Sequence, residues 1–129
     1  MLFRSQDKGH FDVRLRTTST DNNGQPSTAA ADFFVTTKLT HVVFTRAQDG
    51  MAKIFVDGRP VVSATVAGAF NNWSDDFRLC IANELTGDRP WLGDLHLVAI
   101  YSRALTSGDV EQNFNAGLPE QRFVQASLS

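Results

Sequence analysis

The sequence predicts an all-β protein, an antiparallel β-sandwich with one short helix near its C-terminus. Three observations indicate this fold class: many short strand-like segments, turns rich in Gly, Asn and Asp between them, and a single helical pattern late in the chain. The 129 residues, 42% of them hydrophobic and 20% charged, suit one folded domain. We therefore expect a single domain over residues 1–129.

The expected strands follow one another along the chain. Residues 11–17 alternate apolar and polar side chains, which is typical of a half-buried strand. Three β-branched and aromatic segments form a meander through two Asp-Gly turns, whose residues supply the positive φ angles that tight hairpins need. These three segments are residues 41–46, 52–56 and 60–66. Further strands are expected at residues 33–36, 77–82, 92–102 and 122–125.

The end of the chain combines an apolar strand with the helix. Residues 95–101 are apolar at nearly every position, which favours a strand covered on both faces, with His96 as a core histidine. Tyr101 and Leu105 are expected as core residues. Thr106 is a good N-cap with Asp109 three residues later, and Gly117 supplies the C-terminal stop.

Two blocks of the sequence resemble the laminin-G-like domains of the concanavalin A-like lectin/glucanase superfamily. The first holds the strand at residues 41–45 and the strand that ends in the Phe-Val-Asp-Gly turn at residues 55–58. The second holds YSRALT at residues 101–106, where the family has Tyr-x-Arg-Ala-Leu-Ser/Thr before a short acidic helix. The resemblance implies a jelly-roll β-sandwich. About eight expected strands are fewer than the resemblance implies for a complete two-sheet domain, so we expect a domain that is incomplete at its N-terminus.

Several function classes are disfavoured by composition. A net charge of −2 without a basic stripe argues against nucleic-acid binding. No run of 18 apolar residues is present, so no membrane insertion is expected. The N-terminus has no signal-peptide pattern, so a secretion signal would lie outside this sequence.

An enzyme has to be weighed because the superfamily includes glycoside hydrolases. The resemblance would then call for Glu-x-Asp-x-Glu or a close variant, since retaining glycosidases use two neighbouring carboxylates. The only glutamates are Glu84, Glu111 and Glu120. Glu84 and Glu120 have no acidic residue two positions away, and Glu111, which follows Asp109 at this spacing, lies on the predicted helix rather than on a strand. We therefore expect no catalytic residues, and a glycoside hydrolase is the remote alternative.

The polar loop at residues 68–76 is the candidate site. Trp73 offers an aromatic plane on which the C–H face of a sugar can stack, and the surrounding amides and carboxylates can bind its hydroxyls. The expected ligand-binding residues are Asn71, Asn72, Trp73, Asp75 and Asp76. Asp75 and Asp76 are also candidate ligands for calcium, which prefers carboxylate and amide oxygens. A solvated polar loop without metal is the alternative, so no cofactor is certain.

These observations predict a non-catalytic, lectin-like carbohydrate-binding module. Its partner would be a carbohydrate or glycoprotein, and the resemblance implies a multidomain chain that is extracellular, periplasmic or at the cell surface. The alternative is a protein-interaction or structural spacer module of a cell-surface protein. A glycan-binding module needs the loop around Trp73, whereas a spacer does not.

Overall fold

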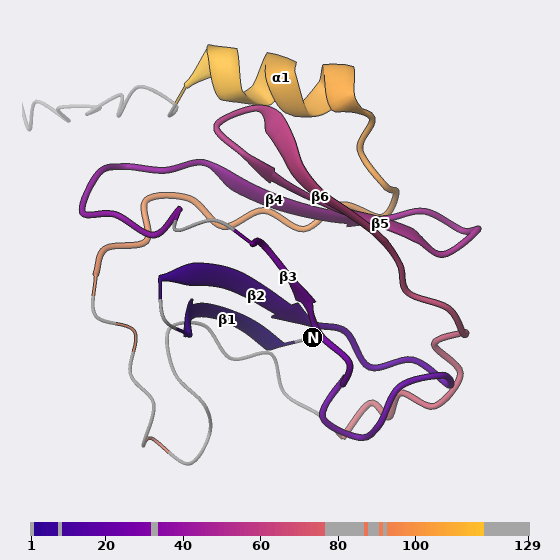
Figure 1. Cartoon of the computed structure of the whole chain (residues 1–129). Helices are drawn as coiled ribbons and strands as arrows, with labels where there is room; N and C mark the ends of the chain where they lie inside the picture. The colour runs from indigo at the N-terminus through magenta and orange to yellow at the C-terminus, as the bar shows by residue number, and fades with distance from the viewer. Residues whose placement is uncertain are drawn as a thin grey trace, which may run out of the picture.

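The computed structural model describes residues 2–7, 9–31, 34–76, 87, 91 and 93–117. This part of the chain forms two antiparallel three-stranded sheets and one helix (Figure 1). The first sheet has the order β1-β2-β3, and the second has the order β4-β5-β6. The elements are β1 (Leu2–Asp7), β2 (His10–Arg14), β3 (Thr28–Ala29), β4 (Val42–Arg46), β5 (Met51–Val56), β6 (Arg59–Thr65) and α1 (Ser107–Ala116).

The predicted three-strand meander is confirmed as β4-β5-β6. Asp57 and Gly58 join β5 to β6 with φ angles of 48° and 79°, which is the left-handed backbone that the Asp-Gly turn predicted. Pro60 lies near the start of β6, where the register against β5 shifts between Ile54 and Phe55. A proline is tolerated there because a bulge interrupts the regular hydrogen-bond ladder.

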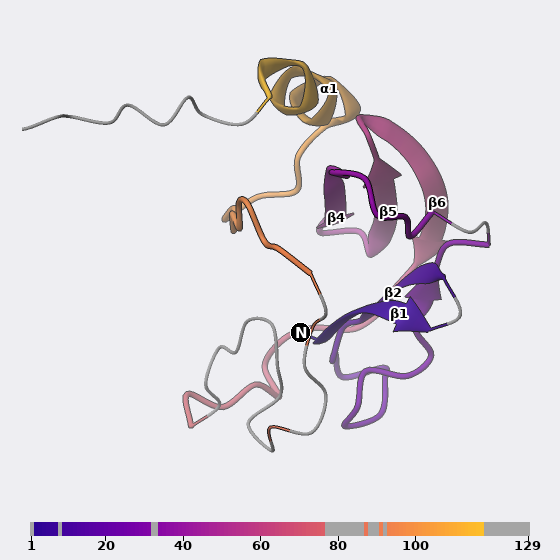
Figure 2. The ribbon, with the colours of Figure 1, turned by 90° about the vertical axis from the view of Figure 1, so that its left-hand side faces the viewer.

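The core lies between the two sheets, which curve around it (Figure 2). Phe11 and Val13 of β2 pack against Ile54 and Val56 of β5, and all four side chains are buried. Side chains alternate along a strand, so Phe55 points to the opposite face of β5 from its two neighbours. These contacts confirm the predicted all-β sandwich.

The helix α1 covers the other face of the β4-β5-β6 sheet. Phe55 packs there with Leu105 and with Val110 of α1, and all three side chains are buried. Leu105 is thus a core residue, as predicted. The expected N-cap is also confirmed, because the Thr106 hydroxyl accepts from the Asp109 amide while the Asp109 carboxylate accepts from the Thr106 amide.

Two strand predictions are wrong within the described residues. Residues 34–36 form no strand, and residues 93–102 run without one although their sequence is strongly apolar. His96 is exposed rather than buried, and Tyr101 is 53% exposed rather than a core residue. The apolar pattern identified side chains that benefit from burial, but the described residues do not cover them. The expected strands at residues 77–82 and 122–125 lie outside the described residues.

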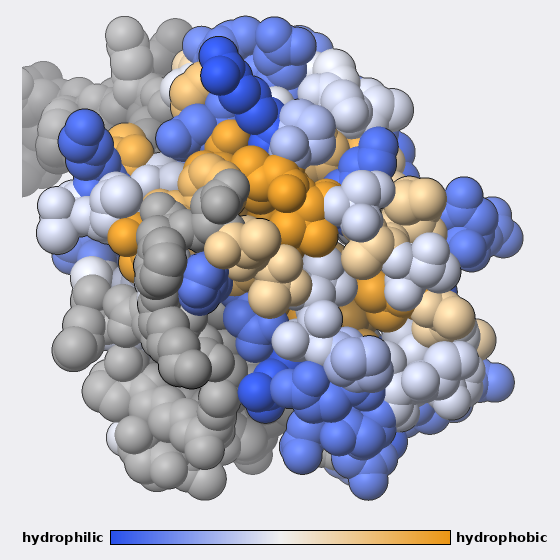
Figure 3. Space-filling view, viewed as in Figure 1, coloured by the Kyte–Doolittle hydropathy of each residue, from blue (hydrophilic) through white to orange (hydrophobic). Residues whose placement is uncertain are grey.

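The uncovered stretch gives one face of the molecule an apolar surface. The apolar side chains near the middle of Figure 3 lie where β6 crosses in Figure 1, whereas the segment of residues 93–102 runs on the far side of that view, to the left of β4 in Figure 2. Its exposed apolar side chains, which are 47–74% exposed, are Leu95, Leu97, Val98, Ile100 and Tyr101. None of the helices in the described part of the chain is long and apolar enough to cross a membrane.

Candidate functional site

The predicted site loop follows β6 and folds back onto the segment after β2. The Trp73 indole Nε1 donates to the carbonyl oxygen of Arg16 at 2.7 Å, and the Asn72 amide Nδ2 donates to the carbonyl oxygen of Thr17 at 3.0 Å. The Thr18 amide donates to the carbonyl oxygen of Ala69 at 3.0 Å. Hydrogen bonds between segments more than 50 residues apart therefore fix the shape of the loop.

Close packing at Gly68 lets these two segments approach. Gly68 has a φ of +89°, and a side-chain Cβ at this position would come within 2.8 Å of the Ser19 amide nitrogen and the Thr17 hydroxyl. Only glycine avoids both the strained backbone and the collision. The buried Thr17 hydroxyl donates to the carbonyl oxygen of Ala67 at 2.7 Å and accepts from the Ser19 amide at 3.2 Å.

Trp73 is both an anchor and an exposed surface. Its indole nitrogen is bonded to the backbone, yet 49% of the residue stays exposed. Phe70, which is 44% exposed, meets the Trp73 ring edge-on at a centroid distance of 5.5 Å and an interplanar angle of 70°. We call these two exposed rings the Trp73 platform. Such tilted pairs are a favourable arrangement of aromatic rings.

Arg46 of β4 lies over the Phe70 ring. Its guanidinium carbon lies 4.8 Å from the Phe70 ring centroid. Its Nε donates to the carbonyl oxygen of Val66 at 2.9 Å and its Nη2 to that of Gly68 at 2.6 Å. A guanidinium fixed in this way stabilises the ring by a cation–π contact. The Trp73 platform is therefore connected to the second sheet.

Sequence reasoning missed Phe70 and Arg46 as parts of this site. Phe70 stands three residues before Trp73, and this spacing of two aromatic residues in one polar loop was a signal. Arg46 is separated from Phe70 by two strands of the meander, so no local pattern indicated their contact.

The polar residues of the predicted site differ in their availability. Asn71, Asp75 and Asp76 are exposed. Asp76 accepts a hydrogen bond from the Ser74 hydroxyl at 3.0 Å. The Asn72 oxygen Oδ1 is buried without a hydrogen-bond partner.

The fit of calcium can be judged from these oxygens. Calcium takes six to eight oxygen ligands, and several of them are usually carboxylates. Asp75 and Asp76 supply two carboxylates, but no group of three His, Cys, Asp or Glu side chains comes together among the residues that the structure describes. The described residues thus give only part of a calcium shell, and calcium at this loop stays a prediction.

The architecture defines a class of protein: two antiparallel sheets packed face to face, with one short helix on the outer face of the second sheet. Comparison with protein families agrees with this class. The model of the Laminin_G_3 family, described as the concanavalin A-like lectin/glucanases superfamily, matches residues 1–111. The chain belongs to this family. No curated protein and no solved structure was found to match the chain.

Proposed function

We propose that this protein is a non-catalytic carbohydrate-binding module of a larger extracellular protein and that the Trp73 platform is its ligand surface. The observation that carries the proposal is the half-exposed Trp73 ring held by the 2.7 Å bond to Arg16. A ring fixed before binding loses little conformational freedom when a sugar stacks on it. Family membership supports a lectin-like role but does not by itself assign one.

The polar residues beside the platform supply the second half of the recognition. Asn71 and Asp75 are exposed in the same loop as Trp73, so their side chains are available to the hydroxyls of a stacked sugar. Binding sites of this kind combine an apolar surface with a few directional polar groups. The only glutamate with an acidic residue two positions away is Glu111, which lies with Asp109 on α1 rather than on a strand, and this supports a binding role rather than hydrolysis.

The test is binding of the folded protein to an array of polysaccharides and glycans, first with calcium and then with a chelator. We expect Trp73→Ala to weaken the strongest interaction by about 2 kcal/mol, or roughly 30-fold in Kd, which is typical of an aromatic residue at the centre of an interface. Binding that the chelator abolishes would support calcium at Asp75 and Asp76. Binding that the chelator leaves intact would rule calcium out as a requirement.

Tyr101→Ala is the matched control because Tyr101 is an equally exposed aromatic residue outside the site loop. The Tyr101→Ala variant should bind glycans with the same affinity as the wild type. Equal losses in Tyr101→Ala and Trp73→Ala would show that the platform is not the site. Hydrolysis of any polysaccharide on the array would contradict the non-catalytic assignment.

A protein-interaction module is the second candidate function. It is favoured by the exposed apolar side chains at residues 95–101, which form the kind of surface that protein partners cover. This candidate predicts that a well-folded sample binds no glycan, and that Tyr101→Ala rather than Trp73→Ala weakens the binding of a protein partner. The two substitutions therefore separate the two functions.

A further inference from the structure

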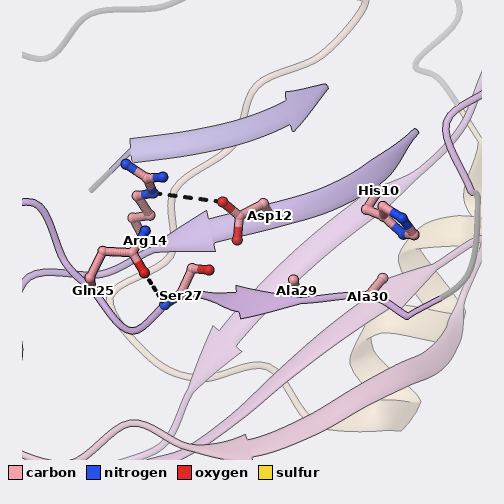
Figure 4. Close-up of a pocket in the computed structure, with 7 residues that line it drawn as sticks. All are labelled: His10, Asp12, Arg14, Gln25, Ser27, Ala29 and Ala30. Atoms are coloured by element: carbon pink, nitrogen blue, oxygen red, sulfur yellow. Dashed lines mark hydrogen bonds and ion pairs between the residues drawn. The ribbon is translucent and has the colours of Figure 1, made fainter. Parts of the chain in front are cut away.

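A row of polar side chains lines the outer face of the first sheet. His10, Asp12 and Arg14 alternate along β2 with Phe11 and Val13, which face the core. The row lies beside small residues of the neighbouring segment, and Ala29 of β3 stands directly opposite Asp12. Long side chains next to short ones leave a hollow of about 340 Å³, lined by His10, Asp12, Arg14, Gln25, Ser27, Ala29 and Ala30 (Figure 4).

Asp12 brings an unsatisfied acceptor to this hollow. The residue is only 6% exposed, and its Oδ1 has no hydrogen-bond partner. Its other oxygen, Oδ2, lies 3.7 Å from Arg14 Nε, which is too far for a hydrogen bond. In Figure 4 one carboxylate oxygen turns toward Arg14 and the other toward the Ser27 side of the hollow. A buried carboxylate oxygen without a donor is destabilising unless something else supplies the donor.

Arg14 brings the complementary unsatisfied donor. Its Nε is buried and likewise lacks a hydrogen-bond partner. The hollow thus holds one unmet acceptor and one unmet donor within a few ångströms of each other. The volume lies at the lower end of the range for small-molecule sites, about 300–1,000 Å³. Such a hollow suits one small polar molecule.

We propose that this hollow binds a neutral polyhydroxylated ligand, such as a single sugar residue. One hydroxyl would donate to Asp12 Oδ1, and a neighbouring hydroxyl would accept from Arg14 Nε. A cation is disfavoured by the guanidinium 3.7 Å from the carboxylate, and an anion is disfavoured by the carboxylate. A hydroxyl group is neutral and both donates and accepts. The hollow is separate from the Trp73 platform, so the two sites can be tested independently.

The test uses two-dimensional amide NMR of the isotope-labelled chain during titration with glucose, galactose, mannose and xylose. At least one of these sugars should produce saturable shifts at the amides of Asp12, Ala29 and Ala30. Asp12→Ala should weaken this binding by about tenfold or more, the loss expected when a hydrogen bond to a charged group is removed. No shift at these amides with any of the four sugars would overturn the proposal.

Ala29→Leu provides a second variant that leaves Asp12 in place. Ala29 is exposed, so a larger side chain there fills the hollow without entering the core. Saturable shifts should disappear in this variant. Because its result does not depend on Asp12, Ala29→Leu remains decisive even if Asp12→Ala fails to fold. Unchanged binding in Ala29→Leu would overturn the assignment of the hollow.

Two further measurements test the class of the ligand and the place where it binds. Glucuronate is a stringent test of the ligand class, because it is an anionic sugar and a basic residue, Arg4 of β1, stands opposite Asp12 in the strand register. Tighter binding of glucuronate than of glucose would overturn the neutral class. Trp73→Ala should leave the shifts at Ala29 intact, whereas their loss in that variant would assign the binding to the Trp73 platform instead.

Discussion

Replacing Thr17 by Val tests whether the site loop is held by the buried hydroxyl beneath it. Valine has nearly the same shape, so the change removes two hydrogen bonds and little else. These are the 2.7 Å bond to the carbonyl oxygen of Ala67 and the 3.2 Å bond from the Ser19 amide. Each is expected to contribute about 0.5–1.5 kcal/mol. Since Ser19 and Ala67 lie near the surface, water can partly replace the lost partner, and we expect a total loss of about 1–3 kcal/mol.

The assay is urea unfolding followed by circular dichroism, with Thr65→Val as the matched control. Thr65 is exposed at the end of β6, so the same chemical change there should alter the free energy of unfolding by about 0.5 kcal/mol or less. Thr17→Val should lower the urea concentration at the midpoint of unfolding without changing the slope of the unfolding free energy with urea concentration. Equal changes in the free energy of unfolding for Thr17→Val and Thr65→Val, each relative to the wild type, would refute the view that the Thr17 hydroxyl holds the loop.

Two other predictions concern the second sheet and the helix. Gly58→Val should lower the free energy of unfolding by about 2 kcal/mol, because φ is +79° and its Cβ would crowd the Phe114 ring at 3.1–3.3 Å; Gly108→Ala, at an uncrowded helical glycine, should raise it by about 0.5–1 kcal/mol in the same denaturation assay. The Asp109 pKa lies well below its usual value, because the carboxylate accepts hydrogen bonds from Arg103 and from the backbone and hydroxyl of Thr106. A depressed pKa stabilises the fold above the unfolded value of about 3.9, so this contribution should be lost as the pH falls below about 4. Asp109→Asn should flatten the dependence of the free energy of unfolding on pH in that range. Urea unfolding at pH 5, 3 and 2 measures this dependence, and the same pH dependence in Asp109→Asn as in the wild type would contradict the role given to the Asp109 carboxylate.

Local patterns predicted the second sheet because its strands are adjacent in the sequence. The β5–β6 connection needs only Asp57 and Gly58, and their residue types report the positive φ angles directly. The helix was equally predictable, because Thr106 and Asp109 are three residues apart and complete their capping box by themselves. In both cases the physical cause and the sequence signal lie within the same few residues.

The apolar segment at residues 95–101 shows the limit of this reasoning. Its composition indicates that burial would be favourable, and it resembles a strand covered on both faces. Whether it is covered depends on other parts of the chain or on a partner, and the segment itself carries no information about them. Tyr101 illustrates this, because its family motif predicted a core position, and yet the residue is 53% exposed.

The candidate site was predictable in its residue types but not in its construction. Trp73 was a candidate ligand-binding residue because it is an aromatic residue among amides and carboxylates. The sequence left open whether it anchors the loop or faces a ligand. The structure shows that the indole nitrogen bonds Arg16 while the ring remains half exposed, so one side chain can anchor the loop and still present a surface. That bond joins residues 57 positions apart. An anchor of this kind makes an exposed ring rigid, and rigidity is what distinguishes a binding platform from an exposed aromatic residue in a loop.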